Sequence, residues 1–352
     1  MRSALSAEGT DASVPRRRLC GAWTLVSVPG FLLALTVSLS AQPKLLINAK
    51  LDTRPGANLQ STVQGLLTAQ PQPAWIMYSV PAVRSNNLGC DWVRDGIGQQ
   101  GVIHLEPPDH VFVAFRVEGN AVTRIRALSP NCEIDAADVP VHWLTDVQPA
   151  ESVALLNSYI PAHELDLSGA ITAIAMHADP AADATLERLV AADKPDWLRQ
   201  RTASLLGSAR GRRGIEILKN VIANDPNERV RERAISGLGG SREPEATDLL
   251  ISIARNDRNS RLRAQAISAL NRKSGQKVIA ALKASVESDP DASVRRRAVS
   301  TLQNMPDGEG VPLLIDLVKN AKDADVRKQA MNSLSQSHDT RAMAFFEDVL
   351  KH

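Results

Sequence analysis

The chain has 352 residues, of which 23% are charged and 3% aromatic, and its formal net charge is +2. Residues 1–41 hold four arginines and two acidic residues, so the rest of the chain carries 37 basic and 37 acidic residues and is neutral. Its basic residues are not interleaved with aromatic ones, and this argues against nucleic acid as a partner.

Residues 1–41 have the pattern of an export signal. Arginines at 16–18 precede an apolar stretch over 19–39, and the small residues Ser40 and Ala41 follow. A basic region, a hydrophobic region and a small-residue cleavage site are typical of a signal peptide. We therefore expect an exported bacterial protein, periplasmic or in the cell envelope. The alternative is an uncleaved inner-membrane anchor over 19–39, because about 20 apolar residues can span a bilayer.

Residues 42–148 are predicted to form a small β-rich α/β domain. The clearest element is a hairpin, in which apolar residues alternate over 111–117 and 123–127 around a turn at 118–120. Further strands are predicted over 44–51, 74–80 and 101–105, and a short helix over 57–69. A domain of about 110 residues can bury a core of its own.

Two cysteines follow the signal segment, Cys90 and Cys132. Because an exported protein meets oxidising conditions, we predict that they form a disulfide. Such a bond would close a long loop and stabilise the fold by about 2–4 kcal/mol. The alternative, a reactive or metal-bound pair, lacks C-x-x-C spacing and a cluster of histidines.

The stretch 132–144, CEIDAADVPVHWL, is the most distinctive part of this domain. Glu133, Asp135, Asp138 and His142 could gather a hard cation or act as acid and base. The alternative is a turn with solvated carboxylates that leads into a short strand. We expect no catalytic residue, metal site or cofactor, and keep an enzyme or a ligand-binding protein with its site in this domain as the alternative function.

Residues 161–352 repeat with a period of 32, after a linking helix predicted over 149–160. Four columns stay in phase through five units, beginning at Leu198, Arg199, Thr202 and Leu206. The first column holds Leu198, Val230, Leu262, Val294 and Val326, and the last holds Leu206, Leu238, Leu270, Leu302 and Leu334. Self-similarity at this period indicates a repeat architecture.

Each unit contains two apolar runs at helical spacing. Val230, Ala234 and Leu238 lie on one face of the first helix, and Leu250 and Ile253 lie on one face of the second. Neither helix can bury its apolar face alone, so neighbouring units must stack. We predict about six units, and the first and last depart from the pattern as capping units do.

An aspartate stands six residues before the periodic arginine in four units. We interpret Asp225-Pro226 and Asp289-Pro290 as an N-cap or near-cap followed by a first-turn proline. We also predict that these aspartates and arginines form a ladder of hydrogen bonds along the stack; the alternative is a set of exposed charges of little energetic value. The ladder residues are Asp193, Arg199, Asp225, Arg231, Asp257, Arg263, Asp289, Arg295 and Arg327. The last unit has Ala321 in place of the aspartate.

The pattern D-x-x-x-x-V-R-x-x-A-x-x-x-L, followed by a second helix, resembles HEAT repeats in the short form of phycobilin-lyase-type HEAT-like proteins. The resemblance covers about 160–352, and residues 42–150 carry none. It implies a right-handed α-α superhelical solenoid. Together with the small β-rich domain that the strand patterns predict in front of it, we expect a multidomain α+β protein. HEAT solenoids generally present their second helices on the concave side, and this implies a surface for another protein.

On this basis we expect an exported scaffold or adaptor for protein–protein interaction. The exposed positions predicted to contact the partner are Lys219, Asp248, Lys277, Lys283 and Lys319. Residues 194–297 carry 22 basic against 12 acidic residues. This excess is compatible with an anionic partner or with arginine as an ordinary solvated residue. A bilin-lyase-like modifying enzyme and a structural spacer in an envelope assembly are the alternatives.

Overall fold

The computed structural model describes residues 46–69, 73–83, 108–160 and 169–351. All of these residues belong to one compact unit. Among these residues, no helix has both the length and the apolar character needed to cross a membrane. The predicted export segment and the predicted strand over 101–105 lie outside the described residues.

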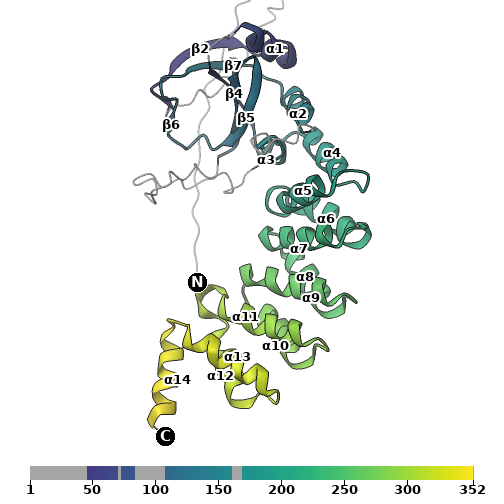
Figure 1. Ribbon diagram of the computed structural model, residues 1–352, viewed down its shortest axis with the longest axis vertical. Coiled ribbons are helices and arrows are strands. Elements are labelled where there is room, and N and C mark those ends of the chain that lie inside the picture. The colour runs from purple at the N-terminus through teal and green to yellow at the C-terminus, as the bar shows by residue number, and fades with distance from the viewer. Residues whose placement is uncertain (1–45, 70–72, 84–107, 161–168, 352) are drawn as a thin grey trace, which may run out of the picture. The chain divides into compact units, whose positions relative to one another are not determined.

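A mixed sheet forms the N-terminal part of the described chain (Figure 1). Its five strands are β2 (Lys50–Pro55), β3 (Ala74–Pro81), β4 (His110–Glu118), β5 (Ala121–Leu128) and β7 (Pro140–Thr145). In the order β2-β7-β3-β4-β5, the first three strands are parallel and the last three are antiparallel. A separate parallel pair is made by β1 (Leu46–Ile47) and β6 (Ile134–Asp135).

Turn chemistry explains where the strands end. The predicted hairpin forms as β4 and β5, and Gly119 and Asn120 adopt φ angles of +55° and +64° between them. Positive φ at both central residues suits a tight hairpin, and glycine and asparagine tolerate it best. The strand predicted over 44–51 is instead divided into β1 and β2, because Asn48 has a φ of +49° and breaks the extended backbone.

Helices α1 (Leu59–Ala69) and α2 (Pro149–Ser158) belong to the core on one side of the sheet. Alternate strand residues point to opposite faces, so Tyr78 and Phe115 join this core while Phe112 and Trp143 form a smaller cluster on the other side. The rings of Phe112 and Trp143 meet edge to face, with centroids 5.3 Å apart. The strands β3, β4 and β7 are therefore buried on both faces, whereas β2 at the edge is largely exposed.

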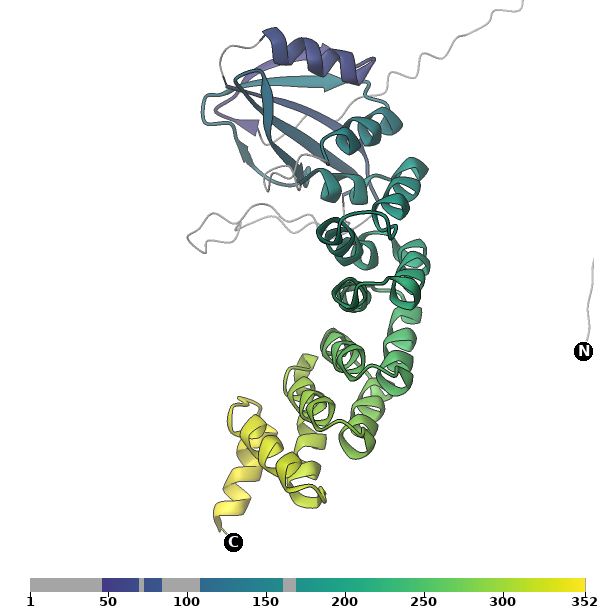
Figure 2. The same cartoon turned by 45° about the vertical axis from the view of Figure 1, so that its right-hand side comes forward.

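Two rows of helices make up the remainder (Figures 1 and 2). The first row contains α3 (Gly169–Met176), α5 (Asp196–Ala209), α7 (Glu228–Gly240), α9 (Ser260–Ala269), α11 (Ala292–Gln303) and α13 (Ala324–Ser335). The second row contains α4 (Pro180–Leu189), α6 (Gly211–Asn224), α8 (Pro244–Asn256), α10 (Gln276–Ser288), α12 (Val311–Asn320) and α14 (Thr340–Lys351). Each first-row helix packs against the next one in its row, so consecutive helix pairs stack.

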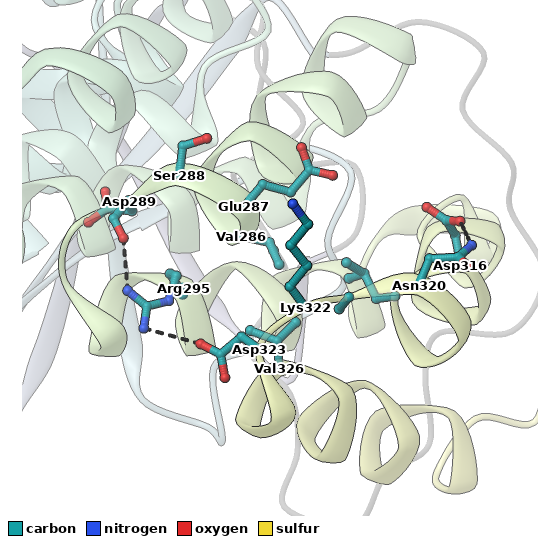
Figure 3. A pocket seen from close by; sticks show the side chains of 12 residues that line it. Val286, Glu287, Ser288, Asp289, Arg295, Asp316, Asn320, Lys322, Asp323 and Val326 are labelled. Atoms are coloured by element: carbon teal, nitrogen blue, oxygen red, sulfur yellow. Dashed lines mark hydrogen bonds and ion pairs between the residues drawn. The ribbon is translucent and has the colours of Figure 1, made fainter.

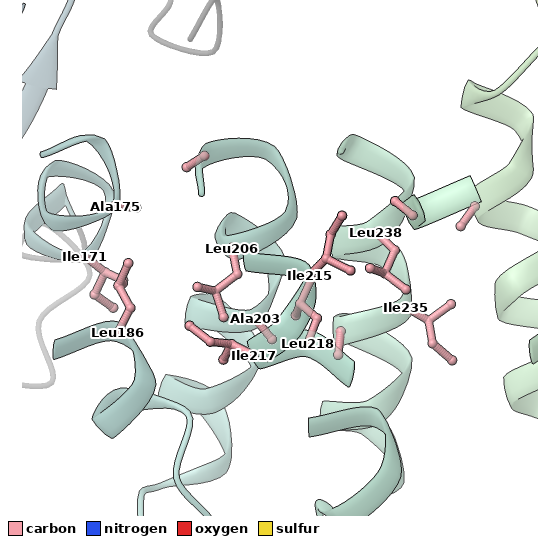
Figure 4. Close-up of a cluster of buried hydrophobic side chains, with 14 of the residues drawn as sticks. Ile171, Ala175, Leu186, Ala203, Leu206, Ile215, Ile217, Leu218, Ile235 and Leu238 are labelled. Atoms are coloured by element: carbon pink, nitrogen blue, oxygen red, sulfur yellow. The ribbon is translucent and has the colours of Figure 1, made fainter. Parts of the chain in front are cut away.

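The periodic apolar columns form the core between the two rows. Leu206, Leu238, Leu270, Leu302 and Leu334 have no exposed surface. Figure 4 shows side chains of α5 and α6, including Ala203, Leu206 and Leu218, meeting between the rows. Full burial of one such leucine is worth about 1.5–3 kcal/mol, which explains why the column keeps its residue type in every unit.

The first-row helices begin two residues later than the Asp-Pro pattern indicates. The N-caps are Asn227, Asn259, Asp291 and Asp323, and each side chain accepts a hydrogen bond from the amide two residues on. Asp225 and Asp289 instead end the preceding helices, with their Oδ1 atoms accepting from the amides of Asn227 and Asp291 at 2.8 and 2.9 Å. These two aspartates thus shape the turn, and the proline after each lies outside the helix.

A buried chain of hydrogen bonds links the sheet to the first solenoid helices. Tyr78 Oη lies 2.7 Å from Ser152 Oγ, which lies 2.8 Å from His177 Nε2. His177 Nδ1 lies 2.7 Å from the Ala173 carbonyl oxygen. A carbonyl only accepts, so Nδ1 carries the proton and Nε2 accepts from Ser152. Burial lowers the pKa of His177 to about 4, so this histidine is neutral at pH 7.

The same junction contains a close backbone contact. Gly169 begins α3, and a Cβ atom there would lie 1.9 Å from the Ile125 carbonyl oxygen of β5. Arg210, between α5 and α6, donates to the His177 carbonyl oxygen and pairs with Asp183 of α4 at 2.7 Å. The sheet and the first helix pairs are therefore held together by buried polar contacts as well as by the apolar core.

Candidate interaction surface

The periodic arginine joins each unit to its neighbours through two kinds of acceptor. Arg263 donates from Nε and Nη2 to both carboxylate oxygens of Asp289, at 2.8 and 2.9 Å, and from Nη1 to the carbonyl oxygen of Asp257 at 3.0 Å. Arg199 makes a similar pair with Asp225, at 2.9 and 3.1 Å. In both pairs the carboxylate thus comes from the aspartate 26 residues later. For Arg263 the aspartate six residues earlier supplies its carbonyl, whereas Arg199 Nη1 donates to the carbonyl oxygens of Ala192 and Lys194. A two-point contact of this kind is stronger than a neutral hydrogen bond.

Two positions depart from this arrangement. Arg231 donates to the Asp225 carbonyl oxygen at 3.0 Å, but it has no carboxylate partner among the described residues, and its Nε is buried without a hydrogen-bond partner. Arg295 reaches Asp323 Oδ2 at 3.2 Å, because Ala321 stands where an aspartate would be. Figure 3 shows this contact beside a hollow of about 500 Å³.

The ends of the ladder are also different. Asp193 pairs with Lys194 at 2.8 Å. Arg327 donates to the carbonyl oxygens of Ala321 and Lys322 at 2.6 and 3.0 Å. The terminal arginine and the first aspartate of the predicted ladder therefore make local contacts instead of joining successive units.

The charged positions predicted on the second helices are exposed, and two of them pair with each other. Lys277 of α10 forms an ion pair with Asp248 of α8. Lys283 of α10 lies 3.7 Å from Asp316 of α12. The Lys319 Nζ atom lies 5.5 Å from the centre of the Phe345 ring. Lys219 is exposed on α6. These charges therefore connect neighbouring units as well as facing solvent.

The first-row helices carry a basic hollow that was not predicted from the sequence. It has a volume of about 750 Å³ and is lined by Asp196, Trp197, Gln200, Arg201, Ser204, Asn227, Arg229 and Arg233. Arg201 and Arg233 occupy the same place in consecutive units, 32 residues apart. The sequence contains this recurrence, and the structure shows that both side chains are exposed.

The structure does not gather the four candidate residues of the 132–144 stretch. Asp135 accepts from Asn48 Nδ2 at 3.0 Å, and hydrogen bonds from the Ala137 amide and Asn48 lower the pKa of its carboxyl. His142 is buried, and its Nδ1 lies 2.9 Å from Asp52 Oδ2. Glu133 and Asp138 are exposed. In the described parts of the chain, no three histidine, cysteine or acidic residues are placed to hold a metal ion.

One cysteine of the predicted disulfide can be placed. Cys132 is 4% exposed and is disulfide-bonded. Cys90 lies outside the described residues, so its pairing with Cys132 stays a prediction.

Comparisons with known proteins agree with this geometry. The family model of HEAT repeats matches residues 182–271, 215–294 and 279–352. The chain is therefore a HEAT-like repeat protein over residues 182–352, with a small β-rich region in front of the helical solenoid. This confirms the resemblance drawn from the repeat pattern.

Similar solved structures include human deoxyhypusine hydroxylase in complex with glycerol, at 16% identity and a TM-score of 0.28, over 57% of this chain and 90% of that one. The complex of CpcE and CpcF of phycocyanin lyase from Nostoc sp. PCC7120 is similar at 20% identity and a TM-score of 0.32, over 54% of this chain and 76% of that one. No curated protein matches the chain in sequence.

Proposed function

We propose that the protein is an exported scaffold that holds another protein on its solenoid. The observation that carries this proposal is the stacked HEAT-like array itself, because HEAT repeats commonly mediate protein interaction. Stacked repeats create extended surfaces that suit a macromolecular partner.

The internal contacts explain why such a surface is rigid enough to bind. The apolar columns fill the space between the rows, and arginines such as Arg199 and Arg263 join consecutive units through buried carboxylates. The exposed positions are free to vary without loss of these contacts. A partner can therefore be recognised by surface residues while the core residues keep the units in register.

Export is supported by the sequence pattern of residues 1–41, with the basic run at 16–18 and the apolar stretch over 19–39. The predicted disulfide fits an oxidising compartment. An inner-membrane anchor over 19–39 remains the alternative arrangement of the same segment.

The proposal is tested by cross-linking the tagged full-length protein in cells and identifying by mass spectrometry both its N-terminus and the proteins joined to it. We expect a new N-terminus at Ala41 or Gln42 and one reproducible protein partner. An intact N-terminus in the membrane fraction would contradict cleavage but keep the scaffold. Clean recovery of the protein with no cross-linked partner would contradict the scaffold function.

A further inference from the structure

We propose that the hollow between α5 and α7 binds an acidic segment of the partner protein, an inference that rests on the proposed scaffold function. Arg201 projects from α5, and Arg229 and Arg233 project from α7. All three side chains are exposed, and the hollow of about 750 Å³ lies among them. Arginine is well suited to such a site because its planar guanidinium can donate two parallel hydrogen bonds to one carboxylate.

The close approach of the two helices brings these arginines together. A Cβ atom at Gly207 of α5 would lie 2.0 Å from the Gly237 carbonyl oxygen of α7, and one at Gly237 would lie 2.5 Å from the Ala203 carbonyl oxygen. Only glycine permits backbones to pack so closely. The contact fixes the C-terminal halves of α5 and α7 against each other, while the arginines belong to the N-terminal halves, where the hollow lies.

The positive charge of the hollow is not neutralised from within the described chain. Arg229 and Arg233 form no ion pair with a described residue, and Arg201 donates only to Thr172 Oγ1, at 3.4 Å. The one acidic residue in the lining, Asp196, already accepts from Arg199 Nη2 at 2.9 Å and from Asn227 Nδ2. The hollow therefore offers three cationic donors against one carboxylate that has partners.

The helix geometry adds to this charge. Helices α5 and α7 begin at Asp196 and Glu228, so the hollow lies over their first turns. The N-terminal end of a helix carries a partial positive charge, and this favours an anionic group nearby. Trp197 lines the hollow and is half-buried, so it supplies an apolar wall beside the arginines. A short segment that combines acidic and apolar side chains matches this lining.

The basic surface is not continuous along the first row of helices, and this favours a peptide segment over nucleic acid. The column that holds Arg201 and Arg233 continues with Gln265, which donates to Ser236 Oγ at 2.7 Å. Arg261 of α9 is paired with Glu228 at 3.0 Å. A nucleic acid backbone requires a basic groove that follows many phosphates. The basic column here is instead interrupted, because Gln265 separates Arg233 from the next arginine of the column, Arg297 of α11.

The test measures the affinity of the full-length protein for a fluorescein-labelled peptide of six glutamates flanked by glycine and serine, by fluorescence anisotropy at low and physiological salt. The double variant Arg229→Gln/Arg233→Gln should bind at least tenfold more weakly. The matched control is Arg296→Gln/Arg297→Gln, which removes the same charge from exposed positions on α11. The control should retain wild-type affinity within twofold.

Three results would overturn the inference. They are no binding of the peptide by the wild-type protein, equal weakening in both double variants, and stronger binding of a six-nucleotide single-stranded DNA that is lost in the same variant. Thermal denaturation of each variant checks that it still folds. We expect little change in stability, because the four arginines are exposed. If cells still yield a cross-linked partner with Arg229→Gln/Arg233→Gln, the scaffold function stands and this site alone fails.

Discussion

Residue 321 shows how much one side chain contributes to the stack. Ala321 ends α12 with φ −62° and ψ 134°, nearly the same backbone as Asp289, which ends α10 with φ −65° and ψ 131°. An aspartate at 321 should therefore reach Arg295 as Asp289 reaches Arg263, and it should accept from the amide of Asp323. We expect Ala321→Asp to raise the free energy of unfolding by about 1 kcal/mol, the usual gain from a charged hydrogen bond that is partly exposed.

Urea denaturation measures this gain, and Ala321→Asn is the matched control. Asparagine has nearly the same shape as aspartate but lacks the charge, so it should recover the turn contact without the ion pair and give a smaller gain. Equal stability of the aspartate variant and the wild-type protein would contradict the ladder as a source of stability.

The buried His177 predicts a particular loss of stability in mild acid. Burial lowers its pKa in the folded protein to about 4, whereas the unfolded chain has the ordinary value of 6.5. Between these values only the unfolded state takes up the proton, so stability falls as the pH decreases from about 6.5 to about 4. We expect this histidine to cost about 2 kcal/mol between pH 7 and pH 5, since each pH unit within that window corresponds to about 1.4 kcal/mol.

Denaturation at pH 7 and pH 5 tests this prediction with His177→Gln, which should show a smaller decrease than the wild-type protein. The exposed His338 provides the control, and His338→Gln should keep the wild-type decrease. The pH range in which His177 takes up its proton is separate from the range in which Asp291 and Asp339 do so. The pKa values of these two aspartates fall to about 2, mainly because of hydrogen bonds from Ser293 and Arg341. An equal pH dependence in all three proteins would contradict the role of His177.

At the scale of elements, the contact between α5 and α7 depends on glycine. In Gly207→Ala the new methyl group would lie 2.0 Å from the Gly237 carbonyl oxygen, so the helices must separate. We expect a loss of about 2–4 kcal/mol, as for overpacking in a rigid core. Gly65→Ala is the control, because nothing lies within 4 Å of that position in α1 and alanine favours a helix. Equal thermal midpoints for the two variants would contradict the close contact.

Elements that depend on local pattern could be predicted from the sequence. The hairpin followed from alternation around Gly119-Asn120, and the helix pairs followed from the 32-residue columns. The parallel pairing of β2 with β7 could not, because it joins residues about 90 positions apart and nothing local specifies the partner. The N-caps were misplaced by two residues, because Asp225 and Asn227 are both good caps and only the chain geometry decides between them.

The candidate surface was harder to predict than the fold. The columns identified the core and the arginines, but they could not show which carboxylate each arginine contacts. Arg231 has the same sequence context as Arg263, yet in the described structure it lacks a carboxylate partner. The hollow at Arg229 and Arg233 lies between two helices that approach closely at Gly207 and Gly237. These features arise from packing between units, which a single sequence does not specify.

At the scale of the whole molecule, the repeat period predicts which deletions are tolerated. Removal of residues 225–256 takes out one complete period and joins Asn224 to Asp257, so every column stays in phase. Nearest-neighbour stacking should then survive. Removal of residues 225–240 takes out a first-row helix alone and leaves the apolar face of α8 uncovered. Circular dichroism during thermal unfolding should show a cooperative transition for the first variant only, and the same outcome for both would contradict independent stacking units.

The central claim is that the solenoid holds a protein partner at its basic hollow. The most direct measurement places a photo-cross-linking amino acid at Gln200, which lines the hollow, and at Lys328, the equivalent exposed position in α13. After irradiation in cells, we predict a discrete protein adduct from position 200 that disappears with Arg229→Gln/Arg233→Gln, and no such adduct from position 328. Equal adducts from both positions, or an adduct from neither, would contradict the claim.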